Sequence, residues 1–140
     1  MADEALQGAH RKLRELAGQL SKQLGPQTAT NADAIRDLLN RMDRILTAHL
    51  AAEETGLYPK LIADRRPNVA ERARNFQREM GGIKKAFSDY SDKWSRSVIA
   101  TQPTIFRRET LSLMAALTGR IEREEQELYP MVVVPAASAR

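Results

Sequence analysis

The residues best suited to chemistry lie in two similar segments of the 140-residue sequence. The heptapeptide EETGLYP begins at Glu53 and EEQELYP begins at Glu124, so the pattern EExxLYP occurs twice. His49 lies four residues before Glu53, whereas Arg120 lies four residues before Glu124. Side chains four residues apart share one face of a helix, so His49 and Glu53 could reach one ion. Histidine and glutamate inside a helical bundle are typical ligands of iron, manganese or zinc.

The elements that must position these residues are helices, because apolar residues recur at steps of three and four. We predict helices over about residues 2–24, 31–58, 68–97 and 103–130, and a frayed tail over 135–140. Gly25-Pro26 should end the first helix, and Pro59 should kink or end the second, because proline cannot donate the helical hydrogen bond. With short loops and no strand pattern, residues 1–140 are expected to form one domain. Its expected fold is an all-α, up-down-up-down antiparallel four-helix bundle, with a long-crossover topology as the alternative.

Each predicted helix carries unusual residues on its apolar stripe at a comparable depth. These residues are His10, His49 with Glu53, Met80, and Arg120 with Glu124. In the up-down-up-down topology they should face one another in one layer. A buried carboxylate is costly unless it is paired, coordinated or protonated, so the two glutamates need a partner. Alternatively, they lie partly solvated at the mouth of the bundle.

These segments resemble the hemerythrin-like, or HHE cation-binding, family. The segment HLAAEETGLYP, from His49, matches the motif H-x-x-x-E-E-x-x-L-[YF]-P, and RIEREEQELYP matches it except at its first residue, Arg120. GAHRKL resembles the first-helix histidine segment. REMGGIKKAF resembles the third-helix segment, with Met80 where a histidine is expected. The resemblance covers nearly the whole chain and implies a pseudo-twofold bundle.

The resemblance also implies roles for individual residues. Glu53 and Glu124 would take the bridging carboxylate positions of a di-iron site, and His10 and His49 would take terminal ligand positions. The neighbouring residues would be structural, as solvated second carboxylates, apolar plugs and helix ends: Glu54, Glu125, Tyr58, Tyr129, Pro59 and Pro130.

The sequence departs from the family pattern at the ligands themselves. Oxygen-binding members of the family would use five histidines, and this chain has two. Met80 is a poor ligand for iron, and Arg120 stays protonated and cannot coordinate a metal. We therefore predict a degraded di-iron site without cofactor, in which Arg120 bridges Glu53 and Glu124. Alternatively, Arg120 points outward and the four remaining ligands hold one Fe, Zn or Mn ion.

Three functions follow from these alternatives. The first is a non-enzymatic regulatory module that binds an unidentified protein or small molecule; the second is a mononuclear metal-binding sensor or redox protein. The third, an oxygen carrier or di-iron oxidase, needs ligands that the sequence lacks. We expect no enzyme activity, since Ser112 has no histidine within its own helical turns and an inward Arg120 would suppress acid–base chemistry by the two glutamates.

Composition and charge limit the classes of partner that the protein is expected to bind. The net charge is +4, but basic and acidic residues are interleaved and no nucleic-acid-binding motif is present, so we expect no nucleic-acid partner. No apolar run approaches the roughly 18 residues needed to span a membrane. The absence of cysteine fits a cytoplasmic protein. The sequence leaves open whether the protein forms a homo-oligomer, because apolar side chains at helix margins could pack between subunits.

Overall fold

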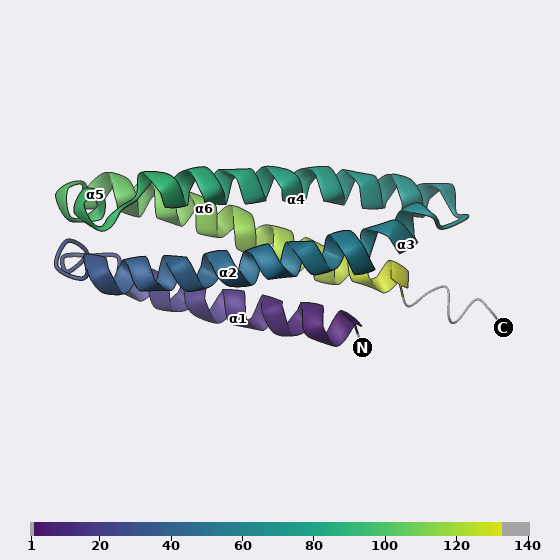
Figure 1. Ribbon diagram of the computed structural model, residues 1–140, viewed down its shortest axis with the longest axis horizontal. Coiled ribbons are helices and arrows are strands. Elements are labelled where there is room, and N and C mark those ends of the chain that lie inside the picture. Colours follow the sequence, from purple (N-terminus) through teal and green to yellow (C-terminus); the bar gives the residue numbers. More distant parts are fainter. Residues whose placement is uncertain (1, 133–140) are drawn as a thin grey trace.

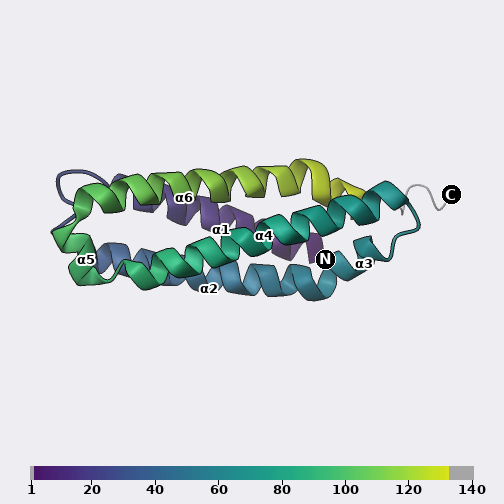
Figure 2. The ribbon, with the colours of Figure 1, turned by 90° about the horizontal axis from the view of Figure 1, so that it is seen from above.

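The computed structural model of the protein describes residues 2–132. Its elements are α1 (Ala2–Lys22), α2 (Ala32–Gly56), α3 (Tyr58–Ile62), α4 (Pro67–Lys93), α5 (Arg96–Thr101), α6 (Pro103–Arg123) and the π-helix η1 (Glu124–Leu128). The long helices α1, α2, α4 and α6 lie side by side with alternating direction, and η1 continues α6 (Figures 1 and 2). The predicted all-α, up-down-up-down bundle is thus confirmed for the described residues, and the tail predicted over 135–140 lies outside them.

The second predicted helix is interrupted where the first EExxLYP copy ends. Helix α2 stops at Gly56, and the chain bends at Leu57 before α3 begins with Pro59 in its first turn. Proline has no N–H to donate, so it is tolerated at a helix start but not inside a helix. The repeat therefore marks a break in α2, and α3 carries the chain on towards α4.

The third predicted helix is shorter than expected. Helix α4 ends at Lys93, and the Arg36 guanidinium of α2 donates hydrogen bonds to the carbonyls of Ser91 and Trp94 at 2.8 and 2.7 Å. These bonds satisfy carbonyls that a helix end leaves without partners. Ser95 then starts α5 by accepting a hydrogen bond from the Val98 amide.

The core consists of two apolar clusters with polar residues between them along the helices. The larger cluster contains Leu13 of α1, Leu46 of α2 and Ile121 of α6. The smaller cluster contains Leu6 of α1 and Leu128 of η1. Leu6 precedes His10 in the sequence, whereas Leu13 of the larger cluster follows it. His10, Glu53 and Glu124 lie in sequence between residues of the two sets, and His49 lies at the end of the larger set, next to Leu50. No helix among the described residues combines the length and apolar character needed to cross a bilayer.

Candidate metal centre

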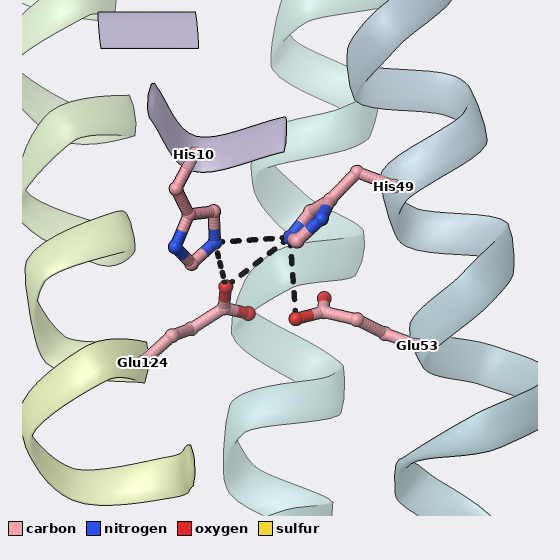
Figure 3. Close-up of side chains that lie close together, drawn as sticks. All are labelled: His10, His49, Glu53 and Glu124. Carbon is pink, nitrogen blue, oxygen red and sulfur yellow. Dashed lines mark hydrogen bonds and ion pairs between the residues drawn. The ribbon is translucent and has the colours of Figure 1, made fainter. Parts of the chain in front are cut away.

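Four buried side chains from three elements meet inside the bundle. His10 comes from α1, His49 and Glu53 come from α2, and Glu124 is the first residue of η1 (Figure 3). Each offers one possible ligand atom, and these atoms all lie within 4.8 Å of one another. His10, Glu53 and Glu124 are 0% exposed and His49 is 3% exposed. These are the four residues that the sequence analysis named as the remaining ligands, and they do not lie at a solvated bundle mouth.

The distances inside this cluster, hereafter the His2Glu2 cluster, are close to the edges of a tetrahedron around one ion. The Nε2 atoms of His10 and His49 are 3.1 Å apart, and Glu124 Oε1 lies 2.9 and 3.4 Å from them. Glu53 Oε2 lies 3.2 Å from His49 Nε2. Metal–ligand distances of about 2.0–2.2 Å give tetrahedral edges of about 3.3–3.6 Å. Four of the six donor–donor distances are thus close to tetrahedral edges, and all four donor atoms lie within 4.8 Å of one another.

A carboxylate and an arginine outside the cluster orient His10. Glu125 Oε2 lies 3.0 Å from His10 Nδ1, and Arg14 donates two hydrogen bonds, of 2.9 and 2.7 Å, to Glu125. When Nδ1–H is donated to Glu125, Nε2 presents its lone pair to the cluster, which is the usual arrangement around a metal-bound histidine. The expectation that Glu125 is merely a solvated second carboxylate was therefore wrong. The doubled glutamate was the signal: one member points inward and the next reaches His10.

The cluster is held by protons when no ion is bound. Burial alone would lower the pKa of His49, but hydrogen bonds with Glu124 and Glu53 outweigh it and raise the pKa to about 9. Burial raises the pKa of Glu53 above its ordinary value. Burial opposes ionisation of Glu124 as well, yet its hydrogen bonds with His10 and His49 bring its pKa below the ordinary value. The two carboxyls thus differ in direction: the lowered pKa of Glu124 favours its anion, and the raised pKa of Glu53 favours its protonated form.

Arg120 lies outside the cluster. Its guanidinium forms an ion pair with Glu79 on α4, and its side chain is 17% exposed. The expected bridge from Arg120 to the two cluster carboxylates was wrong, and the outward alternative holds. Ile121, the next residue, is 1% exposed and takes the inward position of that turn. Pairing with Glu79 at the partly exposed margin costs less desolvation than full burial of the guanidinium in the cluster.

Met80 packs in the larger apolar cluster of the core. It is 2% exposed and lines a cavity of about 200 Å³ together with Leu50 of α2 and Tyr58 of α3. A thioether fills space and is a weak ligand for hard ions, so the Met80 side chain packs the core and does not serve as a ligand. A Cβ added at Gly81 or Gly82 would contact nothing within 4 Å, so these glycines are not there for close helix packing.

The two tyrosines of the repeat have different surroundings. Tyr129 is 5% exposed, and its hydroxyl donates a hydrogen bond to Glu53 Oε2 at 2.9 Å. The same hydroxyl lies 3.1 Å from His10 Nε2 and 3.3 Å from Glu124 Oε1. The Tyr58 hydroxyl is buried without a hydrogen-bond partner. The interpretation of both residues as apolar plugs was therefore wrong for Tyr129, and the repeated LYP was the signal for it.

Three buried polar atoms of the cluster residues have no hydrogen-bond partner. They are His49 Nδ1, Glu53 Oε1 and Glu124 Oε2. A buried carboxylate with an unpartnered oxygen is costly, and a cation bound to the same carboxylate would lower that cost by offsetting its charge. Two imidazoles and two carboxylates are donors that zinc, iron and manganese accept. The residues present therefore fit one metal ion, whereas methionine and arginine replace donors that a second ion would need.

The fold and the cluster define an all-α bundle with a buried histidine–glutamate site of the metal-ligand type. The model of the hemerythrin HHE cation-binding domain matches residues 1–132, so the chain belongs to this family. No curated protein and no solved structure matches the chain. The family resemblance stated from the sequence is thereby confirmed.

Proposed function

We propose that this protein is a hemerythrin-like module that binds a single metal ion through the His2Glu2 cluster, and that it is not an oxygen carrier. The observation that supports this most strongly is the position of Arg120. Its charge pairs with Glu79 on α4 and does not occupy the cluster. The guanidinium therefore does not neutralise Glu53 and Glu124, as the predicted metal-free site required. The four donors instead face one another without a permanent cation.

The proposed role is non-enzymatic and regulatory. A metal would link α1, α2 and η1, whose residues His10, His49 and Glu124 meet through hydrogen bonds that depend on protonation. Metal binding that requires deprotonated ligands stabilises a fold and releases protons. Occupancy of the site would therefore change the rigidity of this part of the bundle, which a protein partner could recognise. In a redox role, the ion would supply one-electron chemistry and the residues would hold and orient it.

The test is metal content and metal-dependent stability of the purified protein. The protein is stripped with a chelator, supplied separately with Fe²⁺, Zn²⁺ and Mn²⁺, and analysed for bound metal after desalting. We expect about one ion per chain and a rise in melting temperature, because a ligand that binds only the folded state stabilises it. Two ions per chain would show that the proposed donor set is too small, and no ion with any of the three metals would refute the proposal.

Neighbouring glutamates on α2 supply a matched control. Glu53→Gln keeps the shape of the side chain but removes an anionic ligand, and should abolish the metal-induced rise in melting temperature. Glu54→Gln makes the same change one residue away, at an exposed side chain that accepts a hydrogen bond from Gln77. It should leave metal binding unchanged. Equal effects of the two substitutions would place the ion elsewhere.

A further inference from the structure

The two copies of EExxLYP have the same spacing but different backbones. In the second copy, the amide of Tyr129 donates its hydrogen bond to the carbonyl of Glu124, five residues back, at the end of the π-helix η1. In an α-helix, residues five apart point about 140° away from each other. A turn closed at the fifth residue instead returns Tyr129 to the face of Glu124, and such π-turns are frequent at functional sites.

The first copy lacks this turn. Helix α2 ends at Gly56, three residues after Glu53, and Tyr58 belongs to α3 beyond the bend. Tyr58 lines the cavity between α2 and α4, and its buried hydroxyl has no hydrogen-bond partner. Equivalent tyrosines of one repeated motif therefore have unequal environments, and only that of the second copy reaches the His2Glu2 cluster.

Tyr129 touches three of the four cluster residues through one oxygen atom. That oxygen lies 2.9 Å from Glu53 Oε2, 3.1 Å from His10 Nε2 and 3.3 Å from Glu124 Oε1. These distances are like those among the four donors themselves. The Tyr129 ring also stacks on the His10 ring, with centroids 5.3 Å apart and an interplanar angle of 12°. The hydroxyl is thus held in place by packing and by the backbone turn.

We propose that Tyr129 is a fifth ligand of this site and that it binds ferric iron as a phenolate. This inference rests on the single-ion site of the proposed function and names the metal that the site prefers. Phenolate is a hard oxygen donor that suits ferric iron, whereas zinc in proteins is satisfied by four ligands. Without iron, the Tyr129 hydroxyl keeps its proton and donates it in the hydrogen bond to Glu53 Oε2. When iron binds, the O–H bond breaks, the oxygen keeps the electron pair, and the proton leaves to solvent.

Absorption and resonance Raman spectroscopy test this ligand directly. The chelator-treated protein receives one equivalent of Fe³⁺ as ferric citrate. We expect a visible tyrosinate-to-iron charge-transfer band, with phenolate ring modes that shift in protein made with ring-deuterated tyrosine. Tyr129→Phe keeps the ring that stacks on His10 and should lose the band. It should also bind Fe³⁺ at least about tenfold more weakly, while Zn²⁺ affinity stays nearly unchanged.

Tyr58→Phe is the matched control, since it removes the equivalent hydroxyl of the first copy and should retain the band. The chain has three tyrosines, so a band retained in both Tyr58→Phe and Tyr90→Phe belongs to Tyr129 even if Tyr129→Phe does not fold. Ferric protein without the band, or a band that survives in Tyr129→Phe, would overturn the ligand assignment. Failure to bind iron, zinc or manganese at all would instead overturn the single-ion site, and the assignment with it.

Discussion

Raising the pH should destabilise the metal-free protein above neutrality, where most small domains change little. The cause is His49, whose pKa is raised from the ordinary histidine value of 6.5 to about 9 in the folded protein. A group with a raised folded pKa contributes its full stabilisation below the unfolded pKa and loses it as the pH rises through the folded pKa. Because one pKa unit corresponds to about 1.36 kcal/mol, the difference is worth about 3 kcal/mol. We expect this loss between about pH 6 and about pH 9.5.

Glu53 acts in the same direction at lower pH. Burial raises its pKa, so the fold prefers its protonated form and loses stability as the carboxyl ionises. Glu124 has a lowered pKa and affects stability only in acid. The three tyrosines have raised pKa values, and they ionise above the range considered. The slope between neutral and mildly alkaline pH therefore reports mainly on His49.

Urea denaturation followed by circular dichroism, with chelator present, measures this effect. The free energy of unfolding should fall by about 3 kcal/mol across the range, which corresponds to a drop of about 10 °C in melting temperature. His49→Asn cannot titrate there and should give a flat profile. Zn²⁺ should reverse the trend, because it binds neutral histidine and competes less with protons as the pH rises. A flat or rising free energy in the metal-free wild type would refute the proposed charge state of the cluster.

Two substitutions outside the His2Glu2 cluster test how strongly its neighbours support the fold and the metal site. Arg120→Ala should cost only about 1 kcal/mol in a urea melt, because its ion pair with Glu79 lies at the partly exposed margin of the bundle. A loss of about 3–5 kcal/mol would mean that its charge supports the buried carboxylates after all. Glu125→Gln should weaken metal binding by about 10–100-fold in a competition titration, because it loosens the orientation of His10, while the metal-free melt changes little. Unchanged affinity would show that Glu125 only pairs with Arg14.

The bundle and the four buried donors could be predicted from the sequence, because they depend on the helical period of the apolar residues and on the topology of the bundle. Helical spacing sets which side chains share a stripe, and an up-down-up-down path brings early positions of α1 next to late positions of α2 and α6. The orientation of Arg120 could not be read from spacing, since Ile121 beside it is equally able to face inward. That choice depends on Glu79, which lies on another helix. Likewise, the π-turn at η1 is a backbone adjustment that side-chain periodicity does not encode.

The position of Arg120 decides what can neutralise the cluster. Two buried carboxylates need positive charge, and the candidates were a fixed guanidinium, protons or a metal ion. With the guanidinium on Glu79, protons on His49 and Glu53 remain in the metal-free state. Both are exchangeable, since a cation that binds the same atoms must displace them. Protons and a metal ion therefore compete for the same ligand atoms of the site. An arginine paired with both carboxylates would have left neither of them free for that competition.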